Sequence, residues 1–283
     1  MMGLPATALS LPLLALALVA APAAQADDDR SCKHSAPQSL ALDIGDARKL
    51  EFHVGNGHLR LDGKPGRQGS LQGRACASSA EELSRLRIEQ TRDGDTLVVR
   101  MLREERSGWN LGNRYAWLDL AGSVPDGMRI EVSVGSGDAR LRGLSELGLT
   151  VGSGDADARA IPGRVDARVG SGDIELADIG SLDLGSVGSG DATVRGVRGD
   201  ARVGSVGSGD LELEDVQGKV DIGSLGSGDI DIGRVGGSVA IGSIGSGDVD
   251  VEAVRGDLTV RALGSGSVDH SGVSGRVDLP RKR

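Results

Sequence analysis

Residues 207–225 read GSGDLELEDVQGKVDIGSL, and this stretch decides the fold of the whole repeat region. Its first four residues define a motif that occurs eight times, with a final copy that ends in Ser267 instead of Asp. The copies begin at Gly135, Gly152, Gly170, Gly188, Gly207, Gly226, Gly245 and Gly264. The spacing, counted in residues, is 17 at first, then 18, and finally 19. A repeat this short indicates a small structural unit stacked on copies of itself.

Each unit contains two short segments in which apolar and polar residues alternate. In the quoted unit these segments are residues 211–213 and 220–222, with Val216 and Leu225 as further apolar positions. Alternation of this kind, broken by glycine, is typical of half-buried strands joined by tight turns. We therefore predict an all-β fold, a single-stranded β-solenoid similar to a parallel β-helix, with 17–19-residue coils. The pattern leaves the handedness and the number of faces open.

The region before the repeats is less regular but also rich in strand patterns. It holds all four aromatic residues of the chain, so the core of the repeats must consist of aliphatic side chains. Residues 50–61 resemble residues 130–141 and are expected to form a degenerate coil of the same solenoid. Residues 86–90 and 96–101 flank Arg92-Asp93-Gly94-Asp95, which predicts a hairpin. This region is predicted to cap one end of the stack.

The N-terminal segment has the pattern of a secretory signal peptide. Residues 11–21 are apolar, and Ala24-Gln25-Ala26 has the small-residue form of a cleavage site. A membrane anchor is the alternative, but the apolar run is short for a bilayer span. The predicted organisation is a signal peptide (1–26), a β-rich cap (27–134), the repeats (135–279) and a basic tail (280–283). Export would place the protein in the periplasm, at the cell surface or outside the cell.

The chain has two cysteines, Cys32 and Cys76. In an oxidising compartment such a pair is expected to form a disulfide, which would staple the N-terminal region and leave the repeats without a covalent bridge. Two buried thiols are the alternative.

The net charge of −9 is concentrated in the repeats, which makes nucleic acid a poor partner. Two positions of the unit carry most of the carboxylates. The first is the corner aspartate that ends the motif: Asp138, Asp155, Asp173, Asp191, Asp210, Asp229 and Asp248. The second lies two residues later: Asp157, Glu175, Glu212, Asp231, Asp250 and Asp269, with Arg140 and Thr193 as exceptions. Stacked coils would carry these as two adjacent acidic rows on one side.

Neighbouring carboxylates about 4.8 Å apart repel by roughly 0.9 kcal/mol per pair in bulk water. Three interactions could offset this cost: hydrogen bonds from backbone N–H groups, arginines from other coils, or calcium between coils. The candidate calcium ligands are Asp210, Glu212, Asp229, Asp231, Asp248 and Asp250. No other cofactor is expected.

The motifs WLDL (117–120), VPDG (124–127) and IEVSVGSGD (130–138) resemble the "putative adhesin" β-strand-repeat family of secreted bacterial proteins. The similarity extends over roughly residues 40–275. This is a domain family of unknown function, and the resemblance implies a β-solenoid, export and a surface-binding or adhesive role. It implies no catalytic residues.

The sequence thus favours an exported, non-enzymatic β-solenoid, an adhesin or envelope scaffold that presents acidic rows to an envelope or extracellular partner. A calcium-binding scaffold is the alternative function. A polysaccharide-acting β-helix enzyme comes third, because no singular site interrupts the repeats and the four histidines do not cluster near a distinctive Ser or Cys.

Overall fold

The structure is a computed structural model that describes residues 32–104 and 114–280. The predicted signal peptide, Trp109 and the last three residues of the basic tail lie outside the described residues. Among the described residues, no helix is long and apolar enough to cross a membrane.

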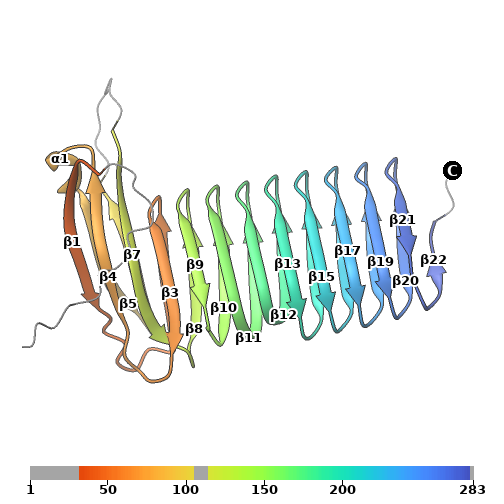
Figure 1. The fold of residues 1–283 in the computed structure, drawn as a ribbon, viewed down its shortest axis with the longest axis horizontal. Helices are drawn as coiled ribbons and strands as arrows, with labels where there is room; N and C mark the ends of the chain where they lie inside the picture. The colour runs from red at the N-terminus through yellow and green to blue at the C-terminus, as the bar shows by residue number, and fades with distance from the viewer. Residues whose placement is uncertain (1–31, 105–113, 281–283) are drawn as a thin grey trace, which may run out of the picture. The chain divides into compact units, whose positions relative to one another are not determined.

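Each coil of the repeat region contributes one strand to each of two parallel sheets, so the solenoid has two faces (Figure 1). The first sheet contains β9 (Asp138–Arg142), the first halves of β11 (Asp155–Val169) and β12 (Ile174–Val187), β13 (Ala192–Val197), β15 (Leu211–Val216), β17 (Ile230–Val235), β19 (Val249–Val254) and β21 (Val268–Ser271). The second contains β8 (Arg129–Val134), β10 (Glu146–Val151), the second halves of β11 and β12, β14 (Ala201–Val206), β16 (Val220–Leu225), β18 (Val239–Ile244), β20 (Leu258–Leu263) and β22 (Val277–Asp278). The predicted β-solenoid is confirmed.

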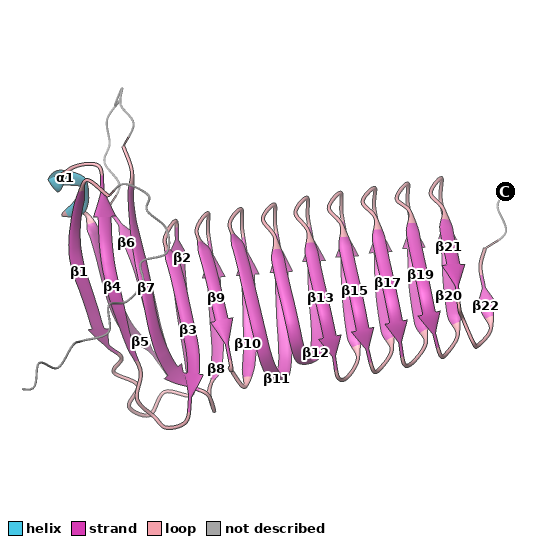
Figure 2. Ribbon diagram, in the orientation of Figure 1, coloured by secondary structure: helices cyan, strands magenta, loops and turns pink. Residues whose placement is uncertain are grey.

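The stacking register follows the sequence repeat directly. Leu211 lies opposite Ile230 in the first sheet, and Val220 lies opposite Val239 in the second, so each pair is separated by one full repeat. Short loops connect the two sheets at both edges (Figure 2). Because equivalent residues stack, every position of the repeat becomes a row of side chains along the stacking direction.

The lengthening of the repeat along the chain comes from two one-residue insertions. Between Ile161 and Arg164 the pairing of β11 with β12 shifts, because β11 has an extra residue in the turn between the sheets. A second shift follows Ala167, where β12 has the extra residue Gly185. Coils from Gly188 onward contain both insertions and therefore have the longest period.

The solenoid begins before the first motif. β2 (Lys49–Gly55) and β3 (His58–Lys64) pair in parallel with β8 and β9, with Leu50 opposite Ile130. The prediction of a degenerate coil at residues 50–61 is therefore confirmed. The turn Gly55-Asn56-Gly57-His58 replaces the repeat corner, and His58 Nδ1 lies 2.8 Å from Asp138 Oδ2.

Further strands close this end of both sheets, the first in each sheet pairing in parallel and the outer ones antiparallel. β6 (Thr96–Arg103) extends the second sheet beyond β2, and β5 (Leu86–Asp93) joins it in the predicted hairpin. β7 (Ala116–Pro125) extends the first sheet beyond β3, followed by β4 (Ser70–Ala77) and β1 (His34–Ala41). A one-turn helix, α1 (Ala80–Leu83), lies between β4 and β5.

The core of a full coil contains only six aliphatic side chains. In the coil that begins at Gly207 they are Leu211, Leu213, Val216, Val220, Ile222 and Leu225, all at most 3% exposed. The two sheets are held together by these six rows of stacked Val, Ile and Leu residues.

The third residue of the corner motif must be glycine for the coils to stack. A Cβ atom on Gly209 would lie 1.8 Å from the carbonyl oxygen of Gly190 in the preceding coil. The equivalent distances at Gly137, Gly154, Gly172, Gly190, Gly228, Gly247 and Gly266 range from 1.7 to 1.9 Å. The glycine is therefore needed for close backbone approach between coils.

We predict that Gly209→Ala destabilises the protein by about 1–3 kcal/mol or more, because the added methyl group collides with rigid backbone. Gly233→Ala is the control, since a Cβ at Gly233 would lie 3.7 Å from its nearest neighbour, Glu214 Oε1. That change should be neutral or stabilising, as expected for a strand glycine. Thermal and urea unfolding followed by circular dichroism measures both. Equal melting temperatures for the two variants would contradict the stacking argument.

Candidate binding surface: the acidic rows

The corner aspartates link each coil to the next one. The Oδ1 atom of Asp210 accepts a hydrogen bond from the backbone N–H of Asp229, at 2.9 Å, and Asp229 accepts one from Asp248, at 3.0 Å. The same bond joins Asp155 to Asp173, Asp173 to Asp191, Asp191 to Asp210, and Asp248 to Ser267. Hydrogen bonds from backbone N–H groups, one of the three interactions considered from the sequence, are thus present, and the N–H groups come from the following coil.

The second acidic row points outward from the first sheet. In its N-terminal half, arginines from the same face neutralise the carboxylates. Arg159 lies 2.8 Å from Asp157 and 3.0 Å from Glu175. Further along, Arg195 donates to Glu212 at 2.8 Å.

The last of these arginines sits at the edge of the first sheet. Arg234 contacts both Glu214 and Asp215, at 3.0 and 2.6 Å.

The C-terminal half of this face has no such compensation. The carboxylates of Asp229, Asp231, Asp248, Asp250, Glu252 and Asp269 form no salt bridge with any residue in the described ranges. Gly233 leaves a hollow of about 280 Å³ among them, lined by Glu212, Glu214, Asp231, Ile232, Asp250 and Glu252. The negative charge of the repeats is thus exposed at one end of the first face.

Asp231 lies at the centre of this uncompensated region. Partial burial, followed by the neighbouring carboxylates of Asp250, Glu212, Asp229 and Asp210, raises its pKa above the ordinary value. By contrast, Asp215 beside the Arg234 guanidinium has a lowered pKa. The two aspartates lie in adjacent coils. Asp215 has an arginine partner, whereas Asp231 has none among the described residues.

Calcium binding between the coils of this face stays a prediction. Within residues 32–104 and 114–280, no three or more His, Cys, Asp or Glu side chains come close enough together to hold a metal ion. The six candidate ligands, Asp210 to Asp250, lie instead in two rows whose steps follow the coil spacing.

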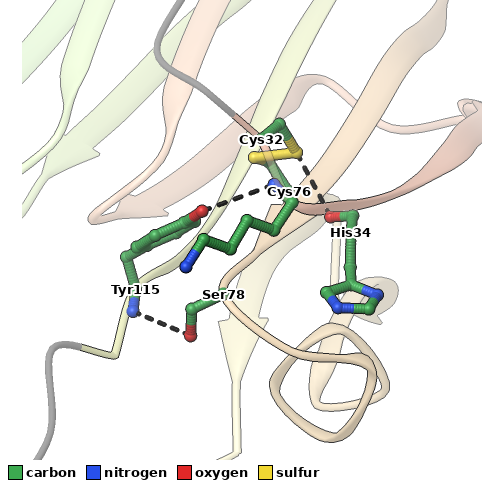
Figure 3. The surroundings of a disulfide bond; sticks show 6 residues. Cys32, His34, Cys76, Ser78 and Tyr115 are labelled. Carbon is green, nitrogen blue, oxygen red and sulfur yellow. Dashed lines mark hydrogen bonds between the residues drawn. A yellow bond between two sulfur atoms is a disulfide. The ribbon is translucent and has the colours of Figure 1, made fainter.

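The predicted disulfide is present between Cys32 and Cys76, whose Cα atoms are 5.6 Å apart (Figure 3). It joins the residues before β1 to β4, at the capped end of the solenoid. Beside it, the backbone N–H of Lys33 donates to the Tyr115 hydroxyl at 3.3 Å. The bond therefore fastens the outermost strand of the cap.

A buried carboxylate in the cap was not anticipated from the sequence. Glu82 on α1 is only 2% exposed and contacts the guanidinium groups of Arg103 (3.0 Å), Arg85 (3.3 Å) and Arg114 (3.5 Å). Burial alone would raise its pKa, but these guanidiniums lower it below the usual value. The helical turn is too short to be recognised by periodicity, so nothing in the sequence marked this residue.

A second unanticipated feature is a row of residues in the left-handed backbone region, one in each coil. Its members are Gly143, Ala160, Asp178, Gly196, Asp215, Arg234, Ala253 and Gly272, with φ between 54° and 76°. Each member lies five residues after the last residue of the corner motif, where the chain turns from the first sheet toward the second. Because five of the eight are not glycine, the sequence did not reveal a common conformation.

No protein-family model matches the chain, and no curated protein matches it. Several solved structures are similar to it in part. A "putative cell adhesion protein" from Clostridium sporogenes has 11% identity and a TM-score of 0.29, and covers 84% of this chain and 99% of its own. A "putative adhesin" from Bacteroides fragilis has 16% identity and a TM-score of 0.41, and covers 87% of this chain and 97% of its own.

The third is a "Putative lipid binding protein" from Parabacteroides distasonis, with 15% identity and a TM-score of 0.38. It covers 87% of this chain and 97% of its own. At these values the similarities carry no argument about function, which must come from the geometry.

For the corner aspartates, we predict that Asp229→Ala lowers the free energy of unfolding by about 1 kcal/mol, because the Asp248 N–H loses its acceptor. Asp229→Asn keeps a side-chain oxygen at this place and should cost less. Urea unfolding at neutral pH compares the two. If both variants lose the same stability, the carboxylate oxygen does not link the coils.

For the second row, we predict that Asp231→Asn raises the melting temperature at neutral pH, with a gain below about 1 kcal/mol because the repulsion is solvent-screened. A carboxyl with a raised pKa favours folding when protonated, so this gain should vanish as the pH falls through that pKa. Asp157→Asn, the equivalent change beside Arg159, should lower the melting temperature. The same shift for both variants would show that the arginines do not set the charge balance.

Proposed function

We propose that this protein is an exported, non-enzymatic β-solenoid that acts as an adhesin or as a binding scaffold of the cell envelope. The contact surface is the C-terminal half of the first face, from Asp229 to Asp269. Its partner carries a basic surface. The observation that supports this proposal is the set of carboxylates on that face without arginine partners among the described residues.

Repelling carboxylates lower stability, so their retention on one part of the face favours a role other than folding. In the N-terminal half of the same face, Arg159 and Arg195 show that the repeat readily accommodates a compensating arginine. In the C-terminal half the same position is occupied by Gly233 and Glu252, so the negative charge is retained. A rigid sheet holds these groups at a fixed spacing, which suits a multivalent contact with a basic surface.

The disulfide supports the location part of the proposal. Disulfides persist in oxidising environments such as the periplasm and the cell exterior. The Cys32–Cys76 bond fastens the outermost strand of the cap and so limits fraying at that end of the sheets. This fits a protein that works outside the cytoplasm.

The proposal is tested by measuring binding of the purified protein to washed envelope fragments from the producing cell. We expect saturable binding that weakens with salt. The variant Asp231→Asn/Asp250→Asn/Glu252→Gln should bind at least tenfold more weakly. A control with the same charge change elsewhere is Asp62→Asn/Asp221→Asn/Asp278→Asn, which should bind like the unmodified protein.

Two outcomes would refute the acidic face as the contact surface. In one, the unmodified protein shows no saturable binding to the fragments. In the other, both triple variants weaken binding equally, so that net charge rather than this face is responsible.

The calcium-binding alternative is separated by titrating the same protein with calcium chloride in a calorimeter. If calcium bridges the coils, binding heat should appear, the melting temperature should rise, and both effects should be lost in Asp231→Asn/Asp250→Asn. Absence of heat together with an unchanged melting temperature removes this alternative.

A further inference from the structure

A groove of about 1130 Å³ runs along the stack at the edge where the chain leaves the first sheet. Six of its lining residues belong to the left-handed row: Ala160, Asp178, Gly196, Asp215, Arg234 and Ala253. A second row, two residues further along each coil, forms the opposite wall and includes Pro162, Arg198, Gln217 and Arg255. From Ala160 to Ala253 the groove crosses five coil spacings, which is about 24 Å.

The backbone strain is concentrated along this groove. Asp178, Asp215 and Arg234 adopt left-handed conformations that glycine would adopt at lower cost. Arg234 and Asp215 pair with each other, which accounts for their presence. Asp178 is exposed, and it forms no salt bridge or side-chain hydrogen bond with any other described residue. Strain of this kind is a reason to look for a ligand.

Two arginines of the groove also lack side-chain partners in the part of the chain that the structure describes. Arg198 and Arg255 are exposed, and neither guanidinium forms a salt bridge or side-chain hydrogen bond within residues 32–104 and 114–280. They occupy the same wall three coils apart, a separation of about 14 Å. With Arg234 balanced by Asp215, and Asp178 as the other negative group, the charged residues of the groove sum to +1 on a strongly acidic protein.

We propose that this groove binds an acidic oligosaccharide, a linear chain of sugars that includes uronic acids. Arg198 and Arg255 pair with carboxylates of the chain, since guanidinium groups bind carboxylates in a two-pronged geometry. Gln217 and Asp178 hydrogen-bond to sugar hydroxyls, which need both donors and acceptors. The exposed apolar parts of Ala160, Pro162 and Ala253 pack against C–H faces of the sugar rings.

An acidic peptide fits the groove less well. A peptide strand binds best where a sheet edge offers free backbone groups. Along this wall the backbone N–H groups already donate to the preceding coil: Gln217 to Val197 and Gly236 to Val216, both at 2.8 Å, and Arg255 to Val235 at 3.0 Å. A saccharide needs only side-chain partners and solvent, so it suits this surface better.

The experiment is calorimetric titration of the purified protein with pectate and alginate oligosaccharides long enough to span the groove. Neutral cello-oligosaccharides and polyglutamate are the comparison ligands. We expect the acidic sugars to bind, and Arg198→Gln/Arg255→Gln to weaken that binding at least tenfold. The control Arg202→Gln/Arg261→Gln removes the same charge from exposed arginines of the second face and should leave the affinity unchanged. Circular dichroism confirms that all variants are folded.

This site lies apart from the acidic face, so the two proposals fail separately. The variant Asp231→Asn/Asp250→Asn/Glu252→Gln should retain sugar binding in full. The oligosaccharide proposal is overturned if neither acidic sugar binds, or if both arginine pairs weaken binding equally. It is also overturned if polyglutamate binds as tightly as the sugars, because the occupant would then be an acidic peptide.

Discussion

The structure depends on the close approach of successive backbones at the glycine corners. At each corner there is no space for a side chain above the carbonyl oxygen of the preceding coil, and from Asp155 onward the N–H group of the next coil bonds to the corner carboxylate. These contacts hold the coils in register over the whole repeat region. With only six aliphatic side chains per coil, the core alone would specify the register weakly, since Val, Ile and Leu interchange at little cost.

In a stack with strict register, residues at the same repeat position form a row along the stacking direction. The charge at a given place on the face is therefore set by a single repeat position, and neighbours along the row are always about 4.8 Å apart. Arg159, Arg195 and Arg234 interrupt the negative rows at intervals, and beyond Arg234 no arginine follows on this face among the described residues. The uneven distribution of arginine thus creates an acidic end and a balanced end on one continuous sheet.

The two ends of the stack differ in structure. At the N-terminal end, antiparallel strands and the disulfide cover the parallel sheets, which would otherwise present open edges. At the other end the motif changes to Ser267. The backbone N–H and the hydroxyl of Ser267 both donate to Asp248 Oδ1, each at 2.8 Å, so this corner is still bound to the coil before it.

The sequence by itself determined the solenoid, the coil length, the inward residues, the hairpin at residues 86–101 and the rows of corner aspartates. These follow from local alternation and from a fixed period, both of which are properties of the chain alone. Only the tertiary structure decided that the two strands of each coil lie in two separate sheets, and hence that the solenoid has two faces, because alternation within a strand does not say in which direction the following turn leads the chain. The Glu82 cluster and the groove were likewise invisible, since they depend on which side chains meet in the folded chain, and the left-handed row was hidden because five of its eight members are not glycine. The hydrogen bonds that the corner aspartates from Asp155 to Asp248 accept from the following coil are of the same kind, because proximity across one whole repeat arises only once the coils are stacked.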